Sequence, residues 1–139
     1  MTWFNPQVFR QNDLRGRAEE DLTPRFNRAI GRAYGTLIQR AGGQRVAIGR
    51  DCRLSGPRIQ ADFVAGILET GIDVIDLGVV PTPLVYFSLH TAEVDGGVAI
   101  TGSHNPSHWN GFKFCLGADS MYGDKIQVLR EMIENDDFV

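Results

Sequence analysis

The sequence predicts an α/β domain with three layers, in which helices cover both faces of a mixed, largely parallel sheet of about four strands. Short apolar runs of strand length alternate along the chain with longer segments whose apolar residues recur at helical spacing. The 139 residues, of which 42% are hydrophobic and 22% charged, suit one domain with a core of its own. We therefore expect a single domain over residues 1–139.

Capping residues mark the helix boundaries in the first part of the chain. Thr23 is a good N-cap and Pro24 suits the first helical position, so a helix begins there and ends at Gly42. Before this helix, a short strand or extended segment runs through residues 9–16. After it, the apolar residues 45–49 predict a buried strand.

The rest of the chain repeats this alternation. A helix between Ser55 and Gly71 carries apolar residues on one face, and the next segment alternates apolar residues with aspartates, as a strand does. Glycine and proline separate the later elements. In order, these are a strand at 72–77, a short helix after Pro83, strands at 97–101 and 112–116, and a helix at 124–135.

Charge is distributed unevenly along the chain. Residues 1–60 hold eleven arginines, no lysine and five acids, whereas residues 61–139 hold three cations and twelve acids. Arginine forms paired hydrogen bonds with phosphate, which makes the arginines in loops next to strands candidate anion ligands. Two observations argue against a nucleic-acid partner. The net charge is −3, and the arginines outside these loops are interleaved with the apolar residues of a predicted helix.

Targeting signals are not evident in the sequence. No stretch approaches the ~20 apolar residues of a membrane span, and the first residues do not resemble a signal peptide. We therefore expect a cytoplasmic protein with no membrane partner. Cys52 and Cys115 lack metal-site spacing, which favours free thiols in a reducing compartment.

The segment at 101–113 carries the most chemistry. It places a serine, two histidines, asparagines and a lysine directly after a buried strand, where α/β sheets bind ligands. It lacks the glycines of a nucleophile elbow and the lysine of a Walker loop, and the chain contains no Gly-x-Gly. The segment therefore predicts a site of another kind.

The same segment allows two plainer interpretations. His104 and His108 have the spacing of a helical zinc pair, but the intervening Pro106 disfavours a helix there. A strand-to-strand turn is the other alternative, because Asn-Pro and Asn110-Gly111 both favour turns. A turn and a site are compatible.

Four ordered motifs resemble the first domain of the α-D-phosphohexomutases, a family that includes bacterial phosphomannomutase/phosphoglucomutase. They are Phe-Arg-x-x-Asp-Leu-Arg-Gly at 9–16, Gly-Arg-Asp-x-Arg-x-Ser-Gly at 49–56, Gly-x-Val-Pro-Thr-Pro at 78–83 and Thr-Gly-Ser-His-Asn-Pro at 101–106. With Asn-Gly-Phe-Lys at 110–113 they cover almost the whole chain. The resemblance implies domain I of four, with domains II–IV outside this sequence.

The resemblance also implies a chemistry. Ser103 would carry a phosphoryl group and exchange it with a hexose phosphate through a bisphosphate intermediate, moving phosphate between the 1- and 6-positions of glucose or mannose phosphate. His104 and Lys113 would exchange protons or stabilise charge, and Arg15 would lie near the reacting phosphate. Mg²⁺ would bind the Ser103 phosphate, with its remaining ligands outside this chain. The expected substrate and phosphate ligands are Arg10, Asn12, Arg53 and Asn105.

Some expectations stay open at this point. In many bacterial members a tyrosine precedes the aspartate of the first motif, whereas Asn12 stands there in this chain. For Arg53, a role in holding the loops is at least as well supported as direct contact with phosphate. The partners would be a hexose phosphate and the remaining domains, so we expect no turnover by the isolated chain. The alternative function is a non-catalytic α/β module that binds a sugar phosphate or a protein.

Overall fold

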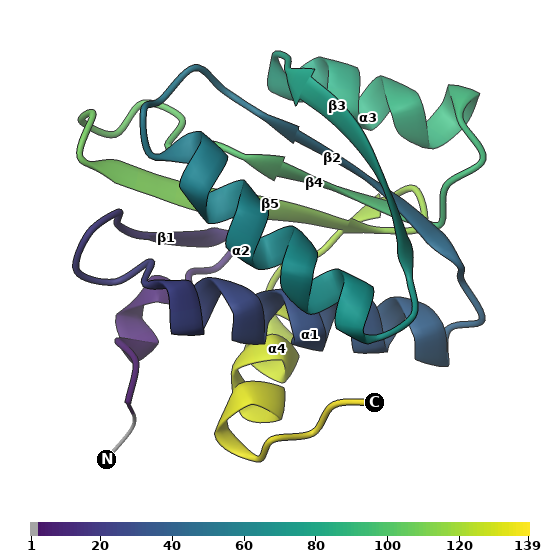
Figure 1. The fold of residues 1–139 in the computed structure, drawn as a ribbon, viewed down its shortest axis with the longest axis horizontal. Coiled ribbons are helices and arrows are strands. Elements are labelled where there is room, and N and C mark those ends of the chain that lie inside the picture. Colours follow the sequence, from purple (N-terminus) through teal and green to yellow (C-terminus); the bar gives the residue numbers. More distant parts are fainter. Residues whose placement is uncertain (1–2) are drawn as a thin grey trace.

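Helices and strands alternate along residues 3–139, the part of the chain that the computed structural model describes (Figure 1). The order matches the sequence-based prediction. The elements are a 3-10 helix at Pro6–Val8, β1 (Leu14–Arg17), α1 (Pro24–Arg40), β2 (Arg45–Arg50), α2 (Gly56–Glu69), β3 (Asp73–Val79), α3 (Thr82–Thr91), β4 (Gly96–Ile100), β5 (Trp109–Leu116), β6 (Asp119–Ser120) and α4 (Asp124–Glu134).

The predicted mixed sheet is present and contains more strands than the four expected. Its order is β1-β5-β4-β2-β3, and β6 pairs with β5. β2 runs parallel to both β3 and β4, whereas β5 is antiparallel to β4, β1 and β6. The four strands that the sequence predicts are therefore largely parallel among themselves. β1, which overlaps the short strand or extended segment expected at 9–16, and β6, which was not expected, both pair antiparallel with β5, so the whole sheet is only partly parallel.

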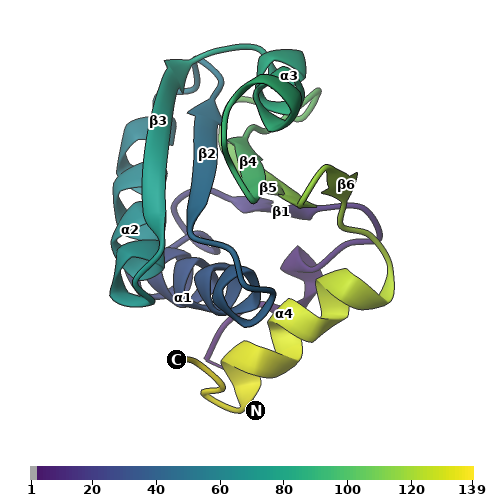
Figure 2. The ribbon, with the colours of Figure 1, turned by 90° about the vertical axis from the view of Figure 1, so that its right-hand side faces the viewer.

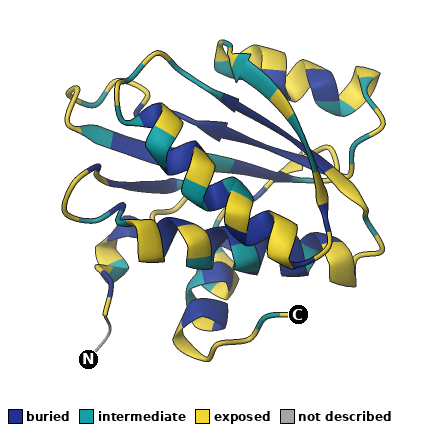
Figure 3. Cartoon of the chain, in the orientation of Figure 1, coloured by how far each residue is buried: buried dark blue, intermediate teal, exposed yellow. Residues whose placement is uncertain are grey.

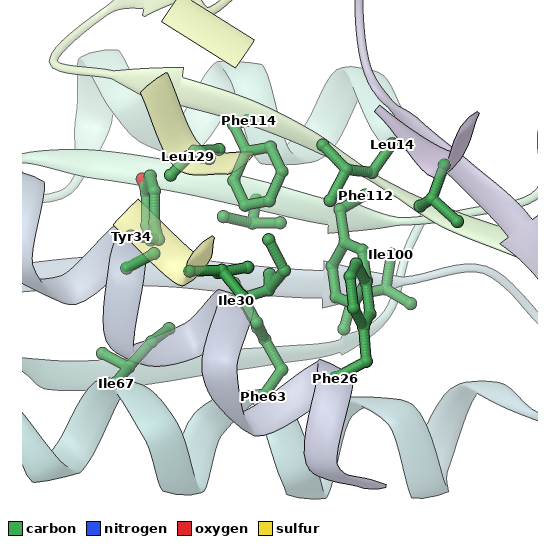
Figure 4. Packing of buried hydrophobic residues seen from close by; sticks show 14 of the residues in the cluster. Leu14, Phe26, Ile30, Tyr34, Phe63, Ile67, Ile100, Phe112, Phe114 and Leu129 are labelled. Carbon is green, nitrogen blue, oxygen red and sulfur yellow. The ribbon is translucent and has the colours of Figure 1, made fainter. Parts of the chain in front are cut away.

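Three layers form because the two faces of the sheet carry different side chains. α1 and α2 lie on one side of the sheet and α3 on the other (Figure 2). On the side of α1 and α2, aromatic and branched residues of these helices and of the sheet pack together, as Figure 4 shows for Phe63, Phe112 and Phe114. α4 adds Leu129 and Ile126 to the same cluster. One continuous core thus joins α1, α2, α4 and the sheet.

The opposite face of the sheet is lined by small residues. Ala47 on β2 and Ala99 on β4 are buried there but lie outside the main cluster, and they let α3 pack close to the sheet through Val85. α3 leaves Leu84 and Phe87 exposed, and Figure 3 shows much of this helix in yellow, the colour of exposed residues. Among residues 3–139, no helix combines the length and the apolarity needed to cross a membrane.

The alternative of a turn at Asn110-Gly111 is not found, because both residues lie inside β5. Gly111 pairs with Arg15 of β1, and a Cβ at Gly111 would collide with the Leu14 carbonyl oxygen. Asn110 is buried and donates from Nδ2 to the Ser55 hydroxyl at 2.9 Å. Close packing of two strands, rather than turn geometry, explains the glycine at this position.

Candidate functional site

Two loops meet at the carboxyl ends of β2 and β4. The strands are parallel neighbours with Arg50 opposite Ile100, so the loops that leave them start side by side. The Asp51 N–H donates to the Ile100 carbonyl oxygen at 3.0 Å and extends the pairing past the last residue of β2. Parallel β2 and β4 thus bring the second and fourth sequence motifs together.

Asp51 and Thr101 organise the turn that leads to Ser103. Asp51 Oδ2 accepts hydrogen bonds from Thr101 Oγ1 at 2.8 Å and from the Gly102 N–H at 3.2 Å. Thr101 Oγ1 in turn accepts from the Ser103 N–H at 2.9 Å. Because Thr101 is 5% exposed, these bonds satisfy groups that water reaches poorly.

All five N–H donors of Arg53 are engaged by protein oxygens. Nη1 donates to the carbonyls of Pro106 (2.6 Å) and Trp109 (3.2 Å), and Nη2 donates to those of Ser103 (2.9 Å) and Asn105 (2.8 Å). Nε donates to Asp51 Oδ2 at 3.2 Å. The planar guanidinium therefore ties four carbonyls of the 101–109 segment to the loop after β2.

Gly102 allows this guanidinium to lie against the main chain. A Cβ at Gly102 would come against Cζ and Nε of Arg53 and would displace the group. The glycine of the Thr-Gly-Ser motif is thus explained by the close approach of Arg53.

Ser103 is exposed and has a φ of 54°, in the left-handed region. Residues other than glycine adopt this region at a cost of about 1 kcal/mol or more, so the surroundings must hold the conformation. The bond from its N–H to Thr101 and the bond to its carbonyl from Arg53 hold both sides of the residue. The serine side chain is presented to solvent on a fixed main chain.

Arg15 reaches the same loop from β1. Its Nη1 donates to the Gly102 carbonyl oxygen at 2.6 Å and to Asn105 Oδ1 at 2.7 Å, and Nη2 is paired with the Asp13 carboxylate. Among residues 3–139, no protein acceptor engages Arg15 Nε. The side chain is only 9% exposed, so its position is fixed by the protein.

A cavity of about 420 Å³ lies beside Ser103. Arg15 and Lys113 enter it from one face of the sheet, because Arg15 is opposite Gly111 on β5 and Lys113 lies two residues further along that strand. The cavity is lined by Asn12, Asp13, Arg15, Tyr86, Ser103, Lys113, Phe114, Ser120, Met121 and Tyr122. A serine, an arginine and a lysine therefore share one concave surface.

The cavity brings together half of the site residues that the sequence predicts. Asn12, Arg15, Ser103 and Lys113 line it. Asn105 does not line the cavity, but it is joined to Arg15 by a hydrogen bond.

The other predicted residues lie elsewhere. Arg10 donates from Nε to the Gln7 carbonyl oxygen and lies 5.9 Å from the centroid of the Trp109 ring. His104 is exposed and does not line the cavity, and Arg53 is engaged by the loop carbonyls.

Sequence reasoning missed two aromatic residues of the cavity, Tyr86 and Tyr122. Tyr86 belongs to α3, and burial, followed by the nearby Cys115 and Asp13, raises the pKa of its phenol. Tyr122 follows β6. Tyr86 lies shortly after the motif at 78–83 but outside the segment that carries Ser103, and only the pairing of β6 with β5 could have placed Tyr122 here.

Metal ligands are sparse around the cavity. The described residues contain no cluster of three or more histidine, cysteine, aspartate or glutamate side chains. Asp13 is paired with Arg15, and Asp51 accepts from the loop after β4. Mg²⁺ prefers about six oxygen ligands in octahedral geometry, and residues 3–139 do not offer such a set around the cavity by themselves.

The two cysteines differ in accessibility. Both are free, with Cys52 exposed in the loop between Asp51 and Arg53 and Cys115 buried in β5. Burial raises the pKa of the Cys115 thiol above its ordinary value.

Comparison with known proteins yields consistent matches. The model of a family described as phosphoglucomutase/phosphomannomutase, alpha/beta/alpha domain I, matches residues 6–139. The chain is 42% identical over 130 residues to the phosphomannomutase/phosphoglucomutase of Pseudomonas aeruginosa, covering 94% of this chain and 28% of that protein. It is 42% identical over 139 residues to the phosphoglucomutase of Neisseria gonorrhoeae, covering 30% of that protein.

A solved structure of the same family matches this fold. The crystal structure of a phosphoglucomutase/phosphomannomutase family protein from Burkholderia thailandensis matches with a TM-score of 0.93 and 38% identity, over 97% of this chain and 31% of that chain. The chain therefore spans less than a third of the length of these relatives.

Proposed function

The chain belongs to the phosphoglucomutase/phosphomannomutase family as its domain I, and from this premise we propose that it is the phosphoserine-bearing part of a hexose phosphate mutase. Ser103 is the phosphoryl carrier in this proposal. The substrate is a glucose or mannose phosphate, and phosphate moves between its 1- and 6-positions. The supporting observation is the exposed Ser103, held at a φ of 54° beside a cavity that Arg15 and Lys113 also line.

The proposed reaction consists of two phosphoryl transfers. First, the bond from phosphorus to Ser103 Oγ breaks as the free hydroxyl oxygen of the hexose monophosphate forms its bond to phosphorus, and the hydroxyl proton passes to a base. The product is a hexose bisphosphate. After it turns round, the bond from its other phosphorus to the sugar oxygen breaks as Ser103 Oγ forms its bond to that phosphorus, and the base returns the proton to the sugar oxygen. One phosphoserine is thus used and one is regenerated.

Charge neutralisation and positioning are what this chemistry needs most from the protein. Arg15 and Lys113 supply positive charge in the same cavity as Ser103. We assign the proton exchange with the sugar hydroxyl to Lys113, with His104, the neighbour of Ser103 in the chain, as the second candidate.

The other predicted residues receive supporting roles in the proposal. Arg53 positions the loop rather than binding phosphate, since all its donors are engaged. Asn105 orients Arg15 through its Oδ1 atom. Asn12 contacts substrate at the cavity rim, and Arg10, which lies against Trp109, attracts the anionic substrate from outside the cavity.

Residues outside this chain complete the proposed enzyme. Relatives are more than three times as long, which supports further domains as partners of this one. We assign most of the Mg²⁺ ligands and the choice of hexose to those domains, and we place the enzyme in the cytoplasm. The isolated chain is then expected to be phosphorylated at Ser103 but not to turn over substrate.

Phosphate mapping tests this proposal. The purified chain is incubated with glucose 1,6-bisphosphate, and the modified residue is located by peptide mass spectrometry. The expected result is one phosphoryl group on Ser103, lost in Ser103→Ala and retained in Ser107→Ala, which removes an exposed hydroxyl from the same loop. Phosphate at a different residue would contradict the proposal. Tight binding of glucose 1-phosphate without any phosphorylation would replace it with the non-catalytic module.

A second test measures turnover. Residues 6–139 replace the matching segment of the Pseudomonas aeruginosa relative, and mutase activity is followed. Ser103→Ala is expected to abolish the activity of an active chimaera, and Ser107→Ala to preserve it. A Ser103→Ala chimaera as active as its parent would sink the assignment of Ser103.

A further inference from the structure

Two tyrosines line the Ser103 cavity and are accounted for neither by the core nor by phosphate chemistry. Tyr122 is 63% exposed and Tyr86 is 37% exposed. Single exposed aromatic residues are common on protein surfaces. This cavity, however, combines two of them with Arg15, Lys113 and Ser103. Ligand sites typically have such walls, in which aromatic surface is combined with a few polar groups.

The main chain around Tyr122 is fixed on both sides. Its predecessor Met121 is 1% exposed and donates from its N–H to the Phe114 carbonyl oxygen at 2.9 Å. Its successor Gly123 donates from its N–H to the Gln11 carbonyl oxygen at 2.7 Å. The exposed ring therefore starts from a backbone that is anchored to β5 and to the loop that carries Asn12. Little conformational entropy is left for a ligand to remove from this backbone.

Tyr86 is held by a different element. It lies in α3 next to the buried Val85, which packs against the sheet near Gly97. Burial, followed by the charges of Cys115 and Asp13, raises the pKa of its phenol, so the phenol stays protonated and able to donate a hydrogen bond. The cavity thus has a ring from α3 and a ring from the segment between β6 and α4.

The division of polar and apolar groups in the cavity matches a phosphorylated sugar. A pyranose ring has apolar C–H faces and a polar edge of hydroxyl groups, so aromatic rings pack against its faces while hydrogen-bonding groups bind its edge. In the proposed function Arg15, Lys113 and Ser103 act on phosphate, and none of them has an aromatic ring to pack against a face of the sugar. Asn12, on the same rim, presents an amide and no ring.

Building on the proposed function, we propose that Tyr122 packs against the sugar ring of the hexose phosphate and that Tyr86 contacts the same ring from α3, donating to a sugar hydroxyl. Neither tyrosine takes part in phosphoryl transfer. They bind the sugar in the orientation that brings its free hydroxyl, or its phosphate, to Ser103.

Tyrosine ring resonances provide a direct readout, because the chain contains three tyrosines and the third is an internal control. Tyr34 is completely buried in the core. The chain is produced with ¹³C-labelled tyrosine rings and titrated with glucose 1-phosphate and, separately, with inorganic phosphate. We expect glucose 1-phosphate to shift the Tyr122 and Tyr86 resonances, inorganic phosphate to shift them far less, and neither to shift Tyr34.

Substitutions then measure what each ring contributes. Tyr122→Ser and Tyr86→Phe are compared with Phe87→Ser, which removes a ring of similar exposure (61%) from α3 outside the cavity. We expect Tyr122→Ser to weaken glucose 1-phosphate binding by about five- to tenfold, Tyr86→Phe by about threefold, and Phe87→Ser to leave it unchanged. An unchanged Tyr34 resonance verifies that each variant is folded.

Two outcomes would overturn the inference. One is a Tyr122→Ser chain that binds glucose 1-phosphate as tightly as the unmodified chain. The other is an unmodified chain in which glucose 1-phosphate leaves both cavity tyrosines unshifted. Neither outcome would contradict the proposed function, because phosphate mapping at Ser103 tests that function independently of the tyrosine rings.

Discussion

The guanidinium of Arg53 donates a hydrogen bond from Nη2 to the carbonyl oxygen of Ser103 at 2.9 Å, across 50 positions of sequence. The bond holds one side of the residue that the proposed reaction uses. Because the same guanidinium also binds the carbonyls of Asn105, Pro106 and Trp109, the conformation of the whole segment depends on a residue from the loop after β2.

Replacing this guanidinium should destabilise the protein. Arg53→Ala leaves four carbonyls without their donor, and the side chain it removes is only 13% exposed. We expect the free energy of unfolding to fall by about 2–3 kcal/mol in urea denaturation, because hydrogen bonds to charged groups contribute about that much. Arg45→Ala, which removes an exposed arginine from β2, should change it by less than about 0.5 kcal/mol. Equal losses in the two variants would show that Arg53 does not hold the loop.

Adding one methyl group at Gly102 should have a similar effect. The Cβ of Gly102→Ala would occupy the position of the Arg53 guanidinium and push it away from the loop carbonyls. We expect a loss of about 1–3 kcal/mol in unfolding free energy and slower phosphorylation of Ser103. In the Arg53→Ala background the same substitution should cost much less, which a double-mutant cycle measures. Additive losses would refute the collision with Arg53.

Thr101 should contribute to stability through the hydrogen bonds of its hydroxyl rather than through the packing of its side chain. Thr101→Val keeps the side-chain volume but removes the acceptor of the Ser103 N–H and the donor to Asp51. Thermal denaturation should show a loss of about 1–2 kcal/mol. Thr91→Val is the matched control, because its hydroxyl donates to the Phe87 carbonyl at an exposed position and should contribute little.

A lysine at position 15 should not reproduce the function of Arg15. The guanidinium binds the Gly102 carbonyl oxygen and Asn105 Oδ1 from one nitrogen while its other terminal nitrogen pairs with Asp13, a geometry that one ammonium group cannot reproduce. We expect Arg15→Lys to slow phosphorylation of Ser103 by about 10- to 100-fold, as for a misplaced positioning group. Rates in Arg17→Lys, the next arginine of β1 and an exposed one, should be nearly unchanged. A fully active Arg15→Lys chain would show that charge alone suffices.

Asp76 should give the stability a small dependence on acid pH. Its pKa is lowered, chiefly by a hydrogen bond from the Gln60 side chain, with help from the Gly78 N–H and Arg50. A lowered folded-state pKa means that the contribution is complete above the unfolded pKa of about 4 and is lost as the pH falls through the folded value. The free energy of unfolding of the unmodified chain should therefore exceed that of Asp76→Asn by at most about 0.5 kcal/mol near pH 6. The difference is small because the carboxylate is 58% exposed and solvent screens its interactions.

Chemical denaturation at several pH values measures this difference. It should shrink as the pH falls below about 4. The same substitution at Asp73, on the same strand, provides the control for asparagine in β3. A difference that grows in acid would contradict the assigned direction.

Helices and most strands were predictable because their signals are local. Thr23 caps α1 as expected, with its Oγ1 accepting from the Phe26 N–H at 3.2 Å, and the family resemblance drawn from the four motifs is confirmed. β6 was missed because a strand of two residues has no periodicity to detect. The sequence of Asn110-Gly111 favours a turn and left that alternative open, whereas the approach of β1, which is remote in sequence, decides its conformation.

The candidate site was predictable only in part, for a related reason. Ser103, Arg15 and Lys113 belong to motifs whose order places them at one edge of the sheet. What a side chain binds is set by its neighbours in space, so the sequence could not show that the loop uses every donor of Arg53. It also could not show that Tyr86 and Tyr122 border the cavity, since neither lies in the segment that carries Ser103.

The position of Cys52 equips this protein with a built-in chemical probe. Its thiol is exposed beside Arg53, whereas the other thiol of the chain, that of Cys115, is buried. A thiol-specific reagent should therefore modify Cys52 first, at a rate that depends on how firmly the loop after β2 is held. Labelling kinetics can follow loosening of this loop in any variant without introducing a foreign dye site, and the slow labelling of Cys115 supplies a simultaneous measure of global opening.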